Sequence, residues 1–280
     1  MGDIAAHTGD MAKRTGNDVA LDTYRFLRGG MVVMAVLLGA ALAVERAHAT
    51  CWQTSISAYY FTTAHAVFVG VLFAIGAMLI VYQGASDTEN TLLNLAGVLA
   101  FVIAVVPTTR PVLQCGTADP VAVQTGSAVL FNAWTVTVVL AGSRAASWLL
   151  FRPKRPGTVL GAAARWLQRA VLGTGVVVLI VAPDWFRINA HGIAAAVMFG
   201  AIVLTVFSSA FGTAPACGSR YRGAYQTISL LMAASLLTAV VLHLSLDGFN
   251  HAVLIAEIAL IMEFTAYWVL QTIEDNSCSH

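Results

Sequence analysis

Eight apolar segments, separated by short polar stretches, divide the chain, and most are long enough to cross a membrane as helices. They are rich in Leu, Val, Ala and Gly, without the apolar–polar alternation typical of membrane β-strands. In lipid, a helix satisfies every backbone hydrogen-bonding group within its own segment. We therefore predict an all-α, polytopic transmembrane bundle. The expected spans are 29–48, 61–83, 91–107, 125–148, 168–183, 189–211, 225–245 and 251–272.

The fourth and fifth spans carry the weakest signal. Ser143 and Arg144 shorten the fourth, and Pro183-Asp184 ends the fifth early. The pattern therefore allows six to eight spans, with eight as the expectation.

Composition supports a membrane protein. Of the 280 residues, 58% are hydrophobic and 10% charged, whereas soluble domains contain about 25% charged residues. The net charge of +1 argues against a nucleic-acid partner. The expected partners are the lipid bilayer and either a lipid ligand or another membrane protein.

The basic residues predict the orientation. With the N-terminus inside and the spans alternating, twelve of the 15 Lys and Arg residues lie in inner segments. Only Arg46, Arg110 and Arg187 fall outside, and this asymmetry is typical of inner loops. Both termini are therefore expected to be cytoplasmic, in the inner (plasma) membrane. A signal peptide ending at residues 47–49 is the alternative for the first span, but Glu45-Arg46 disfavours it.

This orientation divides the chain into three parts. Residues 1–28 form a cytoplasmic N-terminal segment, 29–272 a single transmembrane domain, and 273–280 a cytoplasmic tail. The longest inner connection, 149–167, is basic and contains two prolines. We expect a solvated linker there, with a short amphipathic helix over 162–169 as the alternative.

The four cysteines fall on two sides. Cys51 and Cys115 lie outside in this topology, and Cys217 and Cys278 lie inside. Because disulfides persist outside the reducing cytoplasm, Cys51 and Cys115 are the candidate disulfide. Two free or buried thiols are the alternative.

Ionisable residues within a span suggest function. Glu257 and Glu263 both lie in the last span, but six residues of helix turn them about 120° apart, so they need not share a site. Each could be a structural carboxyl bonded to a neighbouring polar side chain, a catalytic or metal-binding group, or a group that moves protons or ions. The polar residues available as partners are Asn94, Asn132, Ser229 and Ser235.

Four histidines share the predicted outer level. They are His65, His191, His243 and His251. Three protein ligands and a water would suit zinc, and Asp247, Glu257 or Ser57 could then assist the water as a catalytic group. The H-E-x-x-H arrangement is missing from the sequence, so the alternative is a set of polar caps at the membrane interface.

The segment before the second span carries a resemblance. Ser55-Ile56-Ser57-Ala58-Tyr59-Tyr60, followed by Val67-Phe68-Val69-Gly70, resembles an uncharacterised family of bacterial multi-pass membrane proteins. Glu257, Phe264 and Trp268 reproduce the spacing in that family's last span, and residues 191–196 resemble another of its spans. The chain departs from it at His65-Ala66, where relatives often have Arg-Asp, and through two additional spans, the fourth and fifth. The resemblance implies topology and candidate residues but no reaction. From the residues alone, an interfacial aromatic belt with a helix cap also accounts for this segment.

A more distant similarity is to the alkaline ceramidase and adiponectin-receptor superfamily, which places Ser, Asp and three His around zinc. Ser57, His191, His243 and His251 are similar in type but not in spacing, so this is an analogy.

Three functions follow from these patterns. The first is a non-catalytic membrane module, meaning a subunit, a receptor or a lipid-binding scaffold. The second is a transporter or channel that uses Glu257 and Glu263. The third is a membrane-embedded, metal-dependent hydrolase acting at the outer face.

Overall fold

The computed structural model of the chain is helical throughout its regular structure. It describes residues 2–110, 115, 124–151, 158–212, 221–245 and 251–278, with the side chains of 2–18, 20, 151, 240, 242–245, 275, 276 and 278 excepted. No strand occurs in these ranges. Six of the helices are long and apolar enough to cross a membrane, which indicates a membrane protein.

Eight α-helices and one 3-10 helix follow one another in the described ranges, and a different α-helix covers most of each predicted span. The elements are α1 (Gly2–His48), η1 (Ser57–Phe61), α2 (His65–Val81), α3 (Asp87–Val105), α4 (Gly126–Phe151), α5 (Val159–Val181), α6 (Pro183–Phe211), α7 (Arg222–Ser245) and α8 (Ala252–Cys278).

The helix ends differ from the predicted spans in several places, of which three change the predicted division of the chain. Helix α1 begins within the predicted N-terminal segment, and α8 continues through most of the predicted tail. Helix α5 begins at Val159, inside the expected solvated linker, because the Thr158 side chain caps it by accepting a hydrogen bond from Gly161 N–H at 3.0 Å. The predicted break at Pro183 is confirmed, since α5 ends at Val181 and Pro183 opens α6.

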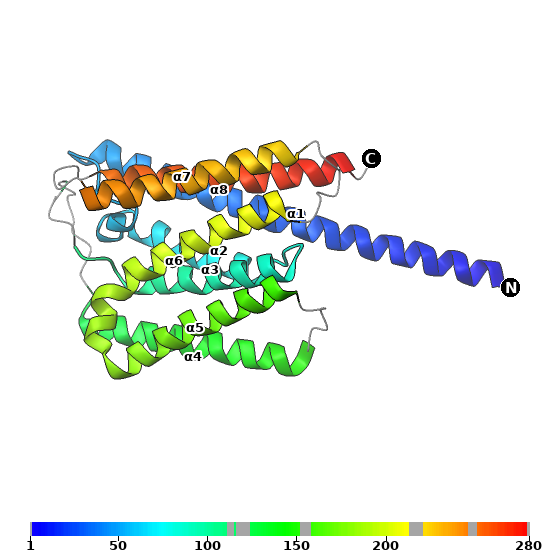
Figure 1. Cartoon of the computed structure of the whole chain (residues 1–280), viewed down its shortest axis with the longest axis horizontal. Coiled ribbons are helices and arrows are strands. Elements are labelled where there is room, and N and C mark those ends of the chain that lie inside the picture. The colour runs from blue at the N-terminus through cyan, green and yellow to red at the C-terminus, as the bar shows by residue number, and fades with distance from the viewer. Residues whose placement is uncertain are drawn as a thin grey trace.

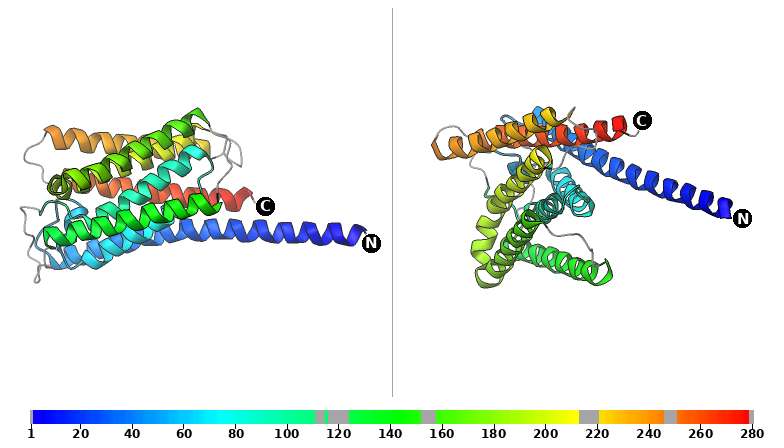
Figure 2. Two further views of the ribbon diagram at one scale, coloured as in Figure 1. Left: turned by 90° about the horizontal axis from the view of Figure 1, so that it is seen from below. Right: turned by 45° about the vertical axis from the view of Figure 1, so that its right-hand side comes forward.

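The helices run back and forth along one direction. The N-terminal end of α1 and the C-terminal end of α8 lie on the same side of the bundle, and α1 projects beyond it (Figures 1 and 2). At the opposite end, Nδ1 of His191, in the third turn of α6, lies 2.6 Å from the carbonyl of Val106, just after α3. The ends of the third and sixth predicted spans that the sequence assigns to one membrane side therefore meet at one end of the bundle.

Helix α3 forms the centre. Its main neighbours are α6 and α2. In an apolar 18-residue stretch of α3, 78% of the residues are buried, against 11% in the corresponding stretches of α4 and α5. Helices α4 and α5 lie at one edge of the bundle, and α7 and α8 lie at the opposite edge (Figures 1 and 2). Large apolar side chains such as Phe131 and Val177 are exposed on the edge helices, as expected for surfaces in lipid.

Two glycines allow α2 and α3 to approach closely. A Cβ atom on Gly97 would lie 2.6 Å from the carbonyl oxygen of Gly76, and one on Gly76 would lie 2.9 Å from that of Gly97. Small residues that permit close backbone contact are typical of packed membrane helices. By contrast, a Cβ on Gly70 or Gly200 would meet nothing within 4 Å.

Candidate functional site

An apolar cavity of about 70 Å³ lies inside the bundle, between α1, α2, α3, α6 and α8. Helix α2 contributes one face to it, through Phe68, Leu72, Ile75 and Leu79. Their spacing of four, three and four residues keeps these side chains on one side of a helix. From Phe68 to Leu79 the lining follows α2 for about 16 Å, at the rise of an α-helix.

The other helices line the cavity with small and flexible apolar residues. Ala100 of α3 and Ala195 of α6 leave the space open, and Met198 and Phe199 of α6 border it. Side chains without hydrogen-bonding groups offer no partners to water, and cavities of this character stay dry or take apolar ligands.

One part of the lining is polar. It is formed by Ser57 of η1 and Glu257 of α8. Glu257 Oε2 accepts a hydrogen bond from the backbone N–H of Ile56 at 2.6 Å, where η1 begins. Leu254 N–H also donates to Thr54 O at 3.1 Å. Two hydrogen bonds therefore join the start of α8 to the segment before η1. In one of them the Glu257 carboxyl pairs with the backbone amide of Ile56, which has no partner within the turn that it precedes.

The 3-10 helix η1 corrects the interpretation of the tyrosine pair as an aromatic belt. Tyr59 and Tyr60 are buried, with exposed fractions of 1% and 2%. Ser55 caps this turn, since its hydroxyl accepts a hydrogen bond from Ala58 N–H at 3.1 Å. Burial raises the pKa of both phenols above the ordinary value, so they stay protonated. Both tyrosines belong to the hydrophobic core, and the Tyr60 ring packs against His65 and Phe68 at the start of α2.

The predicted disulfide is confirmed. Cys51 and Cys115 are bonded, with their Cα atoms 5.0 Å apart. The bond joins the segment after α1 to the segment after α3, so it holds two connections together at the end of the bundle where η1 lies.

The histidines have separate backbone partners. His65 Nδ1 lies 2.7 Å from Tyr60 O, His191 Nδ1 lies 2.6 Å from Val106 O, and His251 Nδ1 lies 3.3 Å from Gln53 O. Within the described ranges, no three His, Cys, Asp or Glu side chains are placed to hold a metal ion. The side chain of His243 and all of Asp247 lie outside those ranges, so the zinc site stays a prediction.

Glu263 has one of the partners expected from the sequence. Ser235 of α7 donates a hydrogen bond to Glu263 Oε1 at 2.8 Å, whereas Glu257 bonds to a backbone amide instead. The two carboxyls therefore serve different helix contacts, as their separation around the helix predicts.

The predicted polar residues Asn94 and Asn132 are also engaged. Asn94 donates to Asn90 O at 2.7 Å and accepts a hydrogen bond from Arg144 at 3.3 Å. Asn132 donates to the Gln124 side chain at 3.2 Å. Neither of them lines the cavity.

Sequence reasoning missed Glu89, which is buried at the start of α3. Its backbone N–H donates to the Ser86 hydroxyl at 3.1 Å, its Oε2 accepts from Ala85 N–H at 3.0 Å, and Ser209 of α6 donates to its Oε1 at 3.0 Å. The sequence signal was the pattern Ser86-x-x-Glu89, a capping box that places a carboxyl beside a helix N-terminus.

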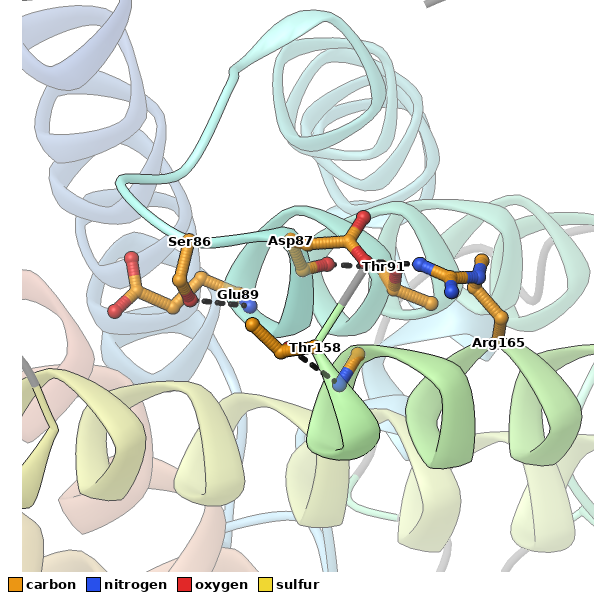
Figure 3. A network of polar contacts seen from close by, with 7 residues as sticks. Ser86, Asp87, Glu89, Thr91, Thr158 and Arg165 are labelled. Carbon is orange, nitrogen blue, oxygen red and sulfur yellow. Dashed lines mark hydrogen bonds and ion pairs between the residues drawn. The ribbon is translucent and has the colours of Figure 1, made fainter. Parts of the chain in front are cut away.

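An ion pair lies beside this cap. Asp87 of α3 contacts the guanidinium of Arg165 on α5, next to the Thr158 cap (Figure 3). The two helix starts thus meet through opposite charges, and a Cβ on Gly161 would collide with the Asp87 carboxylate.

Comparisons of the chain with protein-family models, curated proteins and solved structures find no match. The resemblances described from motifs therefore stay predictions.

Proposed function

We propose that this protein is a non-catalytic membrane module that binds a lipid molecule in the cavity between α1, α2, α3, α6 and α8. The observation that carries the proposal is an apolar cavity whose lining follows one face of α2 and includes Ser57 and Glu257 as its polar residues. A pocket with mostly apolar walls and a few convergent polar groups is typical of a ligand site. The walls would hold a chain, and the polar residues would orient its head.

The proposal includes an orientation. Both termini face the cytoplasm, η1 and the disulfide face the outside, and the membrane is the inner (plasma) membrane. The positive-inside distribution supports this assignment, as does the disulfide, since such bonds persist in oxidising compartments.

Lipid retention by the purified protein tests the binding. The chain offers a matched pair on α6, because Ala195 lines the cavity and its neighbour Ala196 is exposed. Ala195→Phe would fill the cavity, whereas Ala196→Phe would only add apolar surface. After purification in detergent, native mass spectrometry should find bound lipid in the wild type and in Ala196→Phe, and much less in Ala195→Phe. Equal lipid in both variants, or none in the wild type, would refute the proposal.

Cysteine labelling tests the orientation. A Cys51→Ser/Cys115→Ser variant retains Cys217 and Cys278, which should react with a membrane-impermeant maleimide only after cells are opened. In the wild type, reduction should make Cys51, which is partly exposed, reactive to the reagent on intact spheroplasts, whereas Cys115 is buried. Labelling of the double variant in intact spheroplasts would reverse or reject the assignment.

A further inference from the structure

Two residues of the cavity lining, Glu257 and Ser57, are polar, and each has a side-chain oxygen without a hydrogen bond from the described residues. Glu257 makes one hydrogen bond, from Ile56 N–H to Oε2, so Oε1 takes none from the described residues. The Ser57 hydroxyl likewise makes no hydrogen bond within the described ranges, although Ser57 is buried. Buried polar groups are normally paired, so a ligand that pairs with both would gain affinity there.

The charge of the lining restricts what that ligand can be. Glu257 is the one ionisable side chain among the described residues of the cavity wall, and no Lys, Arg or His accompanies it there. An anionic head beside a carboxyl in an apolar surrounding has no countercharge, and bringing it there costs desolvation as well as repulsion. A head that donates hydrogen bonds would instead find an acceptor at Glu257.

The size of the cavity restricts the chain. Its volume of about 70 Å³ is below the roughly 150 Å³ of an apolar cavity that holds benzene. Such a space admits part of one slender chain, lying along the α2 face, and has no room for a second chain.

We infer that the ligand is a single-chain lipid whose head is a hydrogen-bond donor, a hydroxyl or an amine, that binds Glu257 and Ser57, and that phosphate and carboxylate heads are rejected. This inference rests on the proposed lipid-binding function and adds the chemistry of the head. The alkyl chain lies among the apolar residues of α2 and α6, and the Glu257 carboxyl accepts the head's proton in a hydrogen bond.

Three probes with the same chain separate the possibilities: dodecanol, dodecylamine and dodecanoate. Delipidated protein in a detergent with a larger head is titrated with each, and binding is measured by native mass spectrometry at pH 8. We expect dodecanol or dodecylamine to bind at least 10-fold more tightly than dodecanoate. The ratio between the first two shows whether the natural head is neutral or cationic.

Variants then assign the preference to the site. Glu257→Gln should reduce the preference for the donor head over dodecanoate by about 10-fold or more, because the amide can donate to a carboxylate. Glu263→Gln is the matched control, since Glu263 lies on the same helix but bonds to Ser235 outside the cavity, and it should leave the preference unchanged.

The outcomes separate this inference from the proposed function. If none of the probes binds, the lipid-binding function fails and the inference fails with it. If all three bind equally, or if Glu257→Gln leaves the preference intact, the function stands and the inference is wrong. Should Glu257→Gln fail to fold, Ser57→Ala and the wild-type preference among the three probes still decide.

Discussion

Ser209 of α6 donates a hydrogen bond to Glu89 of α3 over 3.0 Å, and its oxygen lies 2.9 Å from the hydroxyl of Tyr267 on α8. When Ser209 donates to the carboxyl, Tyr267 can donate to Ser209, so the three groups form a directed chain across three helices. Gln271 donates to Tyr267 at 2.6 Å and continues the chain.

The chain reaches a guanidinium at its other end. Arg28 of α1 donates to the Tyr82 hydroxyl through Nε at 3.0 Å and Nη2 at 2.7 Å, and Tyr82 donates to Gln271 Oε1 at 3.3 Å. All these bonds can run in one sense, from the positive Arg28 to the carboxyl of Glu89. Hydrogen bonds in such a chain polarise and strengthen one another. We therefore expect this set to stabilise the contacts between α1, α3, α6 and α8.

Ser209→Ala should destabilise the bundle by about 1–3 kcal/mol, because it removes the donor to Glu89 and leaves a buried carboxyl oxygen without a partner. The midpoint of thermal unfolding in detergent measures the effect. Ser208→Ala is the matched control, since Ser208 is the neighbouring residue and its side chain makes no hydrogen bond in the described ranges. An unchanged midpoint for Ser209→Ala would contradict the role of the chain.

Tyr267→Phe tests whether the bonds act together. The ring remains, with its contacts to Tyr225 and Trp268, and only the hydroxyl between Ser209 and Gln271 is lost. In a double-mutant cycle with Ser209→Ala, we expect a coupling free energy of about 0.5–3 kcal/mol. Strictly additive effects would mean that the two hydroxyls stabilise the bundle independently.

The coupling free energy between Asp87 and Arg165 should be smaller than that between Ser209 and Tyr267. Their ion pair joins α3 to α5, but 38% of the Arg165 side chain is exposed, and water screens such pairs to about 1 kcal/mol or less. We expect Asp87→Asn and Arg165→Gln to lower the unfolding midpoint slightly and non-additively. Arg169→Gln on the same helix is the control, since Arg169 lies over the Trp166 ring rather than beside a carboxylate. Raising the salt concentration should narrow the difference between wild type and the Asp87 variant.

The sequence was sufficient to predict the helices and some of their contacts. Hydrophobic length alone predicts helical spans, and the partner of Glu263 was among the predicted polar residues because few such side chains lie in lipid. Arg28 and Arg165 are two of the twelve basic residues that the charge asymmetry assigns to the inner side, and the structure shows them bonded to Tyr82 and Asp87. A charge count sorts residues by side but contains no information about which helices are neighbours.

The cavity and the burial of η1 could not be predicted from the sequence either, because both depend on how the helices pack. The pattern of Ser55 to Tyr60 is compatible with an interface or an interior, and only the packing of α1, α2 and α8 around it makes it an interior. Glu257 likewise marks a site by being ionisable in a span, but its partner is a backbone amide, and no side-chain pattern predicts a backbone amide as partner.

Loss of the Cys51–Cys115 bond should reduce stability. It closes a loop with a sequence separation of 64 residues, and removing such a bond typically costs about 2–4 kcal/mol. The Cys51→Ser/Cys115→Ser variant should unfold at a lower temperature than the oxidised wild type and match the wild type treated with dithiothreitol. Reductant should not lower the variant's midpoint further. The wild type should run faster than the variant on a non-reducing gel, and equal mobilities would contradict the bond.

The contact between Gly76 and Gly97 predicts a substitution pattern that a general effect of alanine would not give. A methyl group on Gly97 meets the Gly76 carbonyl and, at 2.8 Å, Cγ1 of Ile80, so Gly97→Ala must push α2 and α3 apart, at about 1–3 kcal/mol. Gly70→Ala, on α2 like Gly76 but facing open space, should be neutral or stabilising by up to about 1 kcal/mol, since alanine is the better helix former.

The double variant tests the mechanism of that contact. Each methyl group acts on the other glycine's carbonyl, so a bundle already opened by Gly97→Ala has room for the second methyl. Gly76→Ala should therefore cost less in the Gly97→Ala background than alone, whereas Gly70→Ala should have the same effect in both backgrounds. Unfolding midpoints of six proteins measure this: the wild type, the three single variants and the two double variants with Gly97→Ala. Additive losses for the Gly76 and Gly97 variants would mean that the helices do not separate and that each methyl group is accommodated locally.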